Sequence, residues 1–170
     1  MRHTGLFLLL AMMVFTRAGA GESRGDFAGT WKMDTVRSES AHQVAPVEWS
    51  TLTIELKDTV LTFETTRSGV GAPVPFHEKL TLKLDGSETK GVGDGDVEVT
   101  GKARWDGNKL VVETIRNIHD STVTTLYVHT LSANGREMTV DKTLTIQHGY
   151  MGLNAPTSGH GKDIFIRRKA

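Results

Sequence analysis

Apolar and polar residues alternate with a period of two along most of the chain. Between residues 51 and 56, leucine and isoleucine occupy the even positions, and threonine and glutamate occupy the odd ones. Residues 76–84, 97–105 and 123–131 repeat the alternation. This period gives an extended strand one apolar and one polar face, as an antiparallel sheet with a single buried side requires. The further candidate strands are residues 27–33, 61–64, 110–115, 138–146 and 163–168, which gives nine or ten in all.

Dipeptides typical of tight turns separate these runs. They tolerate a positive φ, which hairpin turns need. Their spacing favours consecutive hairpins, because no connection is long and amphipathic enough to form a packed helix. Only residues 35–45 could form a short helix or a loop. The four dipeptides are Asp85-Gly86, Asp94-Gly95, Asp106-Gly107 and Asn134-Gly135.

A sheet with one apolar face must bury that face and protect its edges. Closure into a barrel removes the edges, whereas a sandwich covers the face with a second sheet. Consecutive hairpins favour the barrel. We therefore predict an all-β fold, an antiparallel up-and-down meander of 8–10 strands that closes into a barrel. Side chains can fill the interior of such a barrel, or it can hold one small ligand, and the sequence leaves both open.

The first 20 residues have the composition of a secretory signal. Arg2 and His3 precede an apolar run, Leu6–Phe15, which is too short to span a bilayer. Small residues follow at Ala18–Ala20, where a signal peptidase would cut. We expect residues 1–20 to be a signal peptide and residues 21–170 to be a single domain. The predicted location is secreted or periplasmic, without stable membrane insertion after cleavage.

The composition excludes several classes of function. Lys and Arg together number 20, as do Asp and Glu, so the net charge gives no reason to expect nucleic acid as a partner. Cys is absent, which excludes disulfides, thiol catalysis and zinc–cysteine sites. No histidine pair has metal-ligand spacing, and no nucleophile elbow or phosphate-binding loop occurs. We assign no catalytic residue, metal or cofactor, and we expect a monomer.

The opening of the predicted domain carries a family resemblance. Gly29-Thr30-Trp31 on the first strand, followed by an antiparallel meander, resembles the lipocalins and the wider calycin barrels. The layout also resembles small exported lipocalin-like bacterial proteins of unknown function. In that family the tryptophan closes one barrel end, and a basic side chain of the last strand lies across the indole. The resemblance implies structural roles for Gly29 and Trp31, and it gives the basic role to Arg167 or Arg168.

Tyr127 and His129 are the first candidates for a binding site. They share one face of their strand, and Leu126 and Val128 occupy the other. Either face could point inward. If Tyr127 and His129 point inward, a polar pair lies in an apolar barrel, as in small-molecule and acid–base sites. The alternative is an outward or simply hydrogen-bonded pair. Trp105 could line the same pocket, although such aromatic residues more often belong to a core.

Residues 147–162 form the longest stretch without a strand pattern. The segment is rich in glycine and contains Tyr150, and His148 and His160 lie near its two ends. Long loops of this kind often bind ligands or close over them. We predict a loop over the barrel mouth that brings His148 and His160 together near Asp163. The alternative is a surface loop that covers a sheet edge.

Three functions agree with these observations. The first is a binding protein whose barrel interior holds a small apolar or amphiphilic molecule, with tentative ligand contacts at Trp105, Tyr127, His129, His148, Tyr150 and His160. The second is a barrel enzyme of the isomerase or hydrolase type, which would use the histidines near residues 147–162. The third is an interaction module with a solid core. The free volume inside the barrel and the direction of Tyr127 and His129 separate the three.

Overall fold

A computed structural model describes residues 24–43, 45–148 and 155–169. The predicted signal peptide, residues 1–20, lies outside the described residues. No helix in the described part of the chain is long and apolar enough to cross a membrane. The elements are η1 (Arg24–Phe27), β1 (Gly29–Met33), η2 (Glu39–His42), β2 (Val47–Lys57), β3 (Val60–Gly69), β4 (Phe76–Lys83), β5 (Thr89–Val92), η3 (Asp94–Asp96), β6 (Glu98–Asp106), β7 (Lys109–Ile118), β8 (Ser121–Leu131), β9 (Glu137–His148) and β10 (Thr157–Arg167), where η denotes a short 3₁₀ helix.

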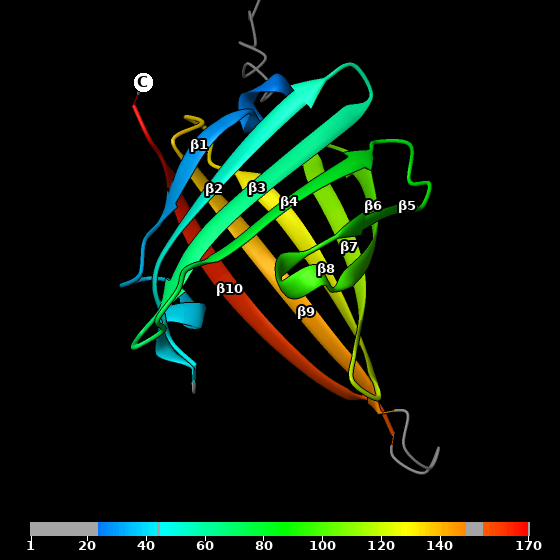
Figure 1. Ribbon diagram of the computed structural model, residues 1–170. Coiled ribbons are helices and arrows are strands. Elements are labelled where there is room, and N and C mark those ends of the chain that lie inside the picture. The colour runs from blue at the N-terminus through cyan, green and yellow to red at the C-terminus, as the bar shows by residue number, and fades with distance from the viewer. Residues whose placement is uncertain (1–23, 44, 149–154, 170) are drawn as a thin grey trace, which may run out of the picture.

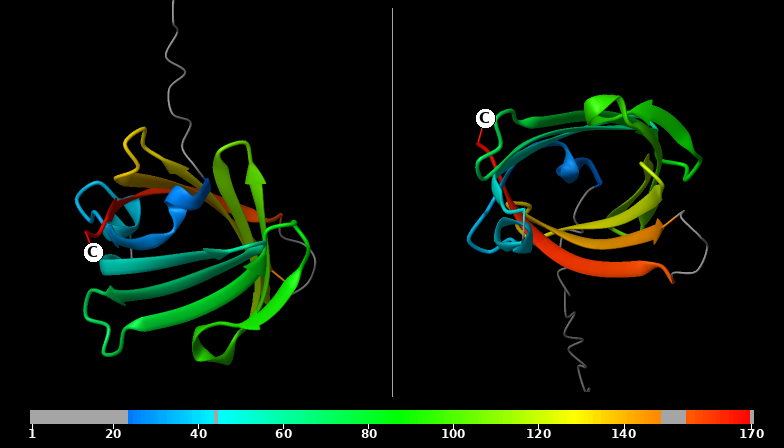
Figure 2. Two further views of the ribbon diagram at one scale, coloured as in Figure 1. Left: turned by 90° about the horizontal axis from the view of Figure 1, so that it is seen from above. Right: turned by 60° about the horizontal axis from the view of Figure 1, so that its bottom comes forward.

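The ten strands form one antiparallel sheet that curls into a nearly closed barrel (Figures 1 and 2). The order of the strands is β4-β3-β2-β1-β10-β9-β8-β7-β6-β5. The first strand pairs with the last, since Trp31 lies opposite Arg167 and Met33 opposite Phe165. The all-β fold class and the up-and-down meander are therefore confirmed.

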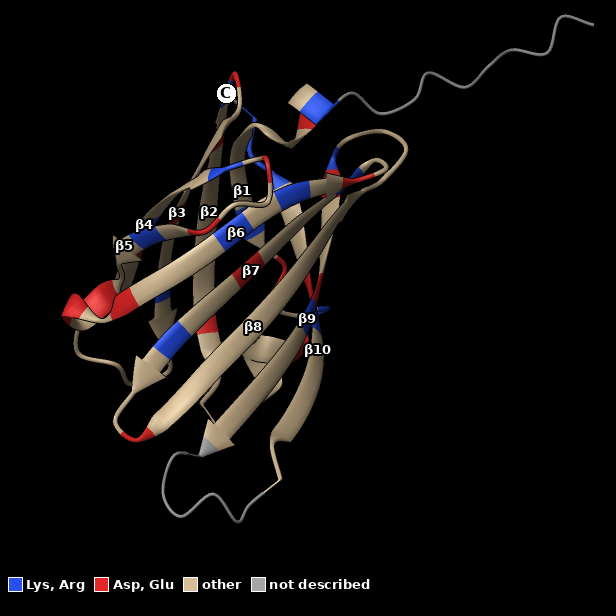
Figure 3. Cartoon of the chain, turned by 90° about the vertical axis from the view of Figure 1, so that its right-hand side faces the viewer, with Lys and Arg blue, Asp and Glu red and all other residues tan. Residues whose placement is uncertain are grey.

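The alternation of side chains matches the prediction from the sequence. Apolar residues from every strand except β5 point inward and form a single buried core. Charged residues of both signs are spread along the strands, and acidic residues gather at η3 (Figure 3). The half of the barrel around β1 is packed with large side chains, namely Phe27, Trp31, Ile54, Leu61, Leu82, Leu110, Leu131 and Met138.

A seam between β4 and β5 interrupts the barrel. These strands are the two ends of the sheet order, so Asp85-Gly86 does not form the predicted hairpin between paired neighbours. Leu80 and Leu82 of β4 line this gap together with β5 and β6, and a pocket of about 210 Å³ remains there. A Cβ atom on Gly101 would lie 2.5 Å from a methyl group of Leu82, so the glycine leaves room for this close packing. At one end Asp85 bridges to Arg104, and the two sides of the seam meet.

Trp31 and Arg167 close one end of the barrel. The indole is fully buried, and its Nε1 donates to the Phe27 carbonyl oxygen at 3.0 Å. The Arg167 guanidinium carbon lies 4.2 Å from the centre of the Trp31 ring. The same guanidinium donates to the carbonyl oxygens of Ala28 (2.8 Å) and Gly135 (2.9 Å) and to that of Asp26. Of the two arginines considered, Arg167 therefore covers the indole.

The neighbours of this pair explain why the closed end tolerates little change. The main-chain N–H of Arg168 donates to the Thr30 carbonyl oxygen at 2.8 Å. Gly29 has a φ of 130°, and a Cβ there would lie 2.9 Å from Arg167 Nη1. Both the backbone conformation and the approach of the guanidinium therefore require glycine at this position.

The prediction of a loop at residues 147–162 is wrong at both ends of that segment. β9 continues to His148 and β10 begins at Thr157, and His160 pairs with Thr143 inside the ladder. The first half of β10 consists of glycine and polar residues, so it lacks the apolar alternation from which the sequence analysis predicted strands. Main-chain pairing with β9 supplies the hydrogen bonds that extend it. Residues 149–154 lie outside the described residues.

We expect Trp31→Ala to lower the free energy of unfolding by about 3–5 kcal/mol, because it removes a fully buried indole and leaves a cavity. Trp31→Phe should cost less, since an aromatic ring remains and only the bond to the Phe27 carbonyl and part of the packing are lost. Urea unfolding of the three proteins measures both effects. Equal midpoints for the wild type and Trp31→Ala would contradict a buried plug.

Candidate functional site: a cavity in the barrel

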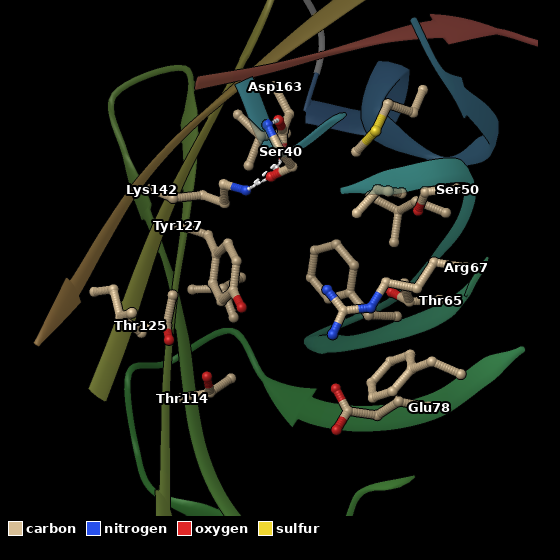
Figure 4. Close-up of a pocket in the computed structure, with 18 of the residues that line it drawn as sticks. Ser40, Ser50, Thr65, Arg67, Glu78, Thr114, Thr125, Tyr127, Lys142 and Asp163 are labelled. Carbon is tan, nitrogen blue, oxygen red and sulfur yellow. Dashed lines mark hydrogen bonds and ion pairs between the residues drawn. The ribbon is translucent and has the colours of Figure 1, made fainter. Parts of the chain in front are cut away.

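The half of the barrel away from Trp31 contains a cavity of about 600 Å³ (Figure 4). Inward residues near the start of β2 and β4 and near the end of β3 and β7 are smaller or more polar than those of the packed half. They therefore leave space where the ring of strands would otherwise be filled. The apolar wall includes Met33, Leu52, Phe63, Leu80, Val112 and Phe165. Exposed residues such as Gln43 and Ala45 border its mouth.

Arg116 and Glu78 form an ion pair on one wall of the cavity. The Arg116 Nη2 atom lies 2.9 Å and 2.7 Å from the two carboxylate oxygens of Glu78. Its Nη1 atom donates to the Thr114 hydroxyl at 2.7 Å. The two charged side chains are 17% and 10% exposed. The negative charge of the Glu78 carboxylate offsets the positive charge of the Arg116 guanidinium. The pair therefore adds little to the electrostatic potential in the cavity.

A second cluster joins η2 to the opposite wall. Asp163 accepts from the Ser40 main-chain N–H at 3.0 Å and from the Ser40 hydroxyl at 2.8 Å. Lys142 Nζ lies 2.5 Å from Asp163 Oδ2 and also donates to the Ser40 hydroxyl. Ser38, which is fully buried, both donates to and accepts from the main chain of Ile164. These bonds fasten the segment around η2 to β10 and neutralise Lys142.

Arg67 is the cation of the cavity that has no acidic partner. Its guanidinium carbon lies 4.4 Å from the centre of the Phe76 ring, and Figure 4 shows the side chain pointing into the space that Glu78 and Tyr127 also face. Within the described residues, no carboxylate lies within ion-pair distance of Arg67, although Arg116 and Lys142 both have one. This guanidinium therefore determines where an anionic group would be most stable in the cavity.

His129 lies deep in the cavity and is 4% exposed. Its Nδ1 atom lies 3.0 Å from the Leu110 carbonyl oxygen, and its ring stacks on Phe63 with 5.3 Å between centres. Burial disfavours the charged imidazolium and lowers the pKa of His129 to about 4. The Tyr127 ring, 6.3 Å away between centres, points into the same space.

Comparison with solved structures shows what kind of barrel this is. A Schistosoma mansoni fatty-acid-binding protein in complex with arachidonic acid is 16% identical, covers 87% of this chain and all of its own, and has a TM-score of 0.53. A secretory abundant heat-soluble protein from Ramazzottius varieornatus is 15% identical, with 85% and 96% coverage and a TM-score of 0.53. The fold is a calycin-like barrel. A structure described as the REP1-NXSQ fatty acid transporter is 11% identical, with 85% and 98% coverage and a TM-score of 0.51. No family model matches the chain, and no curated protein matches its sequence.

The residues that the sequence analysis selected lie in different parts of the calycin-like barrel. Tyr127 and His129 point inward and line the cavity. Trp105 lies outside the cavity wall, where its ring packs edge-on against Phe27 at 5.4 Å between centres. His160 borders the mouth but is exposed, and its Nδ1 bonds the Thr143 hydroxyl. Tyr150 and the side chain of His148 lie outside the described residues.

Sequence reasoning missed four polar residues of the cavity. Glu78, Arg116, Lys142 and Arg67 each occupy a position of the inward parity in their strand, among apolar neighbours. A charged residue at such a position is the signal that could have found them, because an unpaired buried charge is costly and is seldom present without a partner or a ligand.

The neutral, buried state of His129 predicts a specific pH dependence of stability. In the unfolded chain this imidazole takes up a proton near pH 6.5, whereas in the barrel it does so only near pH 4. Stability should therefore fall as the pH decreases from 6.5 to 4, by about 3 kcal/mol from this residue. His129→Leu should remove that part of the dependence, as measured by urea unfolding at pH 7 and pH 4.

The exposed His42 provides the control for this experiment. The difference in stability between the two pH values should be the same in His42→Gln as in the wild type. An equally steep loss in His129→Leu would show that His129 is not held neutral.

Proposed function

We propose that this chain is an exported binding protein that holds a small amphiphilic molecule inside its barrel. The observation that carries the proposal is the open cavity of about 600 Å³, with an apolar wall and one guanidinium that lacks an acidic partner. Small-molecule sites in proteins typically measure about 300–1,000 Å³ and combine apolar walls with a few polar groups. The cavity matches that description in both size and lining.

The structural neighbours support the same class of ligand. One of them holds arachidonic acid, and another is described as a fatty acid transporter. A molecule of this class has an apolar chain and an anionic end. In this barrel the apolar part would contact the wall formed by Leu52, Phe63 and Val112, and the anionic end would pair with Arg67.

The observations favour this function over the two alternatives. A solid-core module requires a filled interior, whereas this barrel contains a cavity of about 600 Å³. The enzyme alternative needs histidines that converge. His129 lies deep in the cavity, whereas His160 is exposed at the mouth with its Nδ1 bonded to the Thr143 hydroxyl. The side chain of His148 lies outside the described residues.

Displacement of 1-anilinonaphthalene-8-sulfonate fluorescence tests binding and its charge preference. Dodecanoate should displace the probe at lower concentration than dodecyltrimethylammonium, because Arg67 attracts an anion. Arg67→Met should weaken dodecanoate binding by about 3–5-fold, as expected for a partly exposed ion pair. Arg104→Met is the matched control, since Arg104 is exposed and follows the inward residue Ala103 in β6. The proposal would be contradicted if none of these compounds bound.

Export is proposed from the composition of residues 1–20. We expect the protein recovered from the periplasm or the medium of its host to begin at Gly21, since the small residues Ala18–Ala20 precede that point. N-terminal sequencing of the recovered protein measures this. A mature protein that begins at Met1 and stays inside the cell would contradict export while leaving the binding proposal intact.

A further inference from the structure

The His129 ring lies deep in the barrel, and among the described residues no group bonds its Nε2 atom. Within the described part of the chain, the ring bonds the Leu110 carbonyl oxygen through Nδ1, stacks on Phe63 and lies tilted against Tyr127. Among the described residues, Thr89 Oγ1 is the buried side-chain atom that lacks both a hydrogen-bond partner and access to open space. Nε2 also lacks a hydrogen-bond partner but is not enclosed in this way, so it has access to open space. Because His129 lines the cavity, that open space is the cavity.

The Leu110 carbonyl fixes the hydrogen-bonding role of this atom. A carbonyl oxygen can only accept, so at 3.0 Å the Nδ1 atom must carry the proton. The imidazole is neutral near pH 7 because it is buried. A neutral imidazole carries one proton, and Nε2 is therefore left with a lone pair and can only accept a hydrogen bond.

Other polar groups of the cavity do not carry such a constraint. Tyr127, Thr125, Thr65 and Ser50 line the same space with hydroxyl groups, which can either donate or accept. The charged groups deeper in the wall are already paired, Arg116 with Glu78 and Lys142 with Asp163. Besides Arg67, which can only donate, His129 is thus the cavity residue whose hydrogen-bonding role toward a ligand is fixed, and it can only accept.

We infer that the ligand donates a hydrogen bond to His129 Nε2 from a neutral hydroxyl or N–H group at its buried end. The inference rests on the proposed function and specifies its ligand class. A carboxylate has no proton to donate and would face a lone pair at this position, so an anionic group belongs near Arg67 instead. A hydrocarbon end would leave Nε2 buried and unpaired, which costs free energy.

An isosteric pair of probes tests the inference. 2-Naphthol and 2-methylnaphthalene have nearly the same shape, and only the first can donate. Isothermal titration calorimetry gives the ratio of their affinities for the wild type, His129→Leu and the exposed control His42→Gln. The ratio in favour of 2-naphthol should fall at least about tenfold in His129→Leu, the size of one buried hydrogen bond, and should be kept in His42→Gln.

A second measurement does not depend on the folding of a variant. In wild-type protein labelled with ¹⁵N at histidine, the Nε2 resonance of His129 should move upfield when 2-naphthol binds, because a lone pair becomes a hydrogen-bond acceptor. Saturation with 2-methylnaphthalene should not shift it in this way. The same experiment in the free protein should show Nδ1 protonated and Nε2 unprotonated.

The outcomes separate this inference from the proposed function. If both probes bind and their affinity ratio is the same in the wild type and His129→Leu, the cavity binds ligands but the inference is wrong. A ratio that is lost in Tyr127→Phe and kept in His129→Leu would assign the contact to the tyrosine and also overturn it. If neither probe nor the amphiphiles bind, the proposed function itself is wrong.

Discussion

Pairing of β1 with β10 converts an open meander into a barrel. The described contact is short, with Trp31, Lys32 and Met33 opposite three residues of β10. A short ladder contributes few hydrogen bonds. Arg167 compensates by bonding three carbonyl oxygens in two segments, at residues 26–28 and at Gly135, and its guanidinium covers the Trp31 indole. The guanidinium satisfies carbonyl groups that the barrel end would leave without donors, and the buried indole removes the space through which water could reach them.

Closure then determines the inside of the molecule. Each strand sends every second side chain into the same enclosed volume, so residue size decides where the volume is filled. Large apolar side chains fill the half near Trp31, and smaller or polar ones leave the cavity in the other half. Charged residues are tolerated there because they form ion pairs, one across the barrel and one between neighbouring strands. Glu78 on β4 meets Arg116 on β7, and Asp163 on β10 meets Lys142 on β9.

The sequence predicted the strands, the closure and the role of Trp31 because each depends on local pattern. Alternation determines which face of a strand is apolar, and this holds for β2 and β6. In β8 it left either face open, and the structure turns Tyr127 and His129 inward. The sequence pattern did not predict the Glu78–Arg116 pair. The two residues are 38 positions apart in the chain, and their strands are not neighbours in the sheet. The pattern also missed the start of β10, where glycine and polar residues are held extended by main-chain pairing with β9. The sequence also did not predict the seam between β4 and β5. A turn dipeptide such as Asp85-Gly86 is compatible both with flanking strands that pair and with flanking strands that do not.

Two polar groups of the cavity, Arg67 and His129, have no protein side chain as a hydrogen-bond partner among the described residues, and they make its two ends chemically different. Arg67 offers positive charge beside the exposed part of the wall, and His129 offers a lone pair deep within it. Between them the wall is largely apolar, with Phe63, Leu52 and Val112 exposed to the space. A bound molecule must therefore satisfy two opposite requirements at its two ends, and reversing it would place its donor beside a guanidinium that also donates. Because both mismatches cost free energy, the arrangement favours one orientation of an amphiphile, which a uniformly apolar cavity of the same volume would not do.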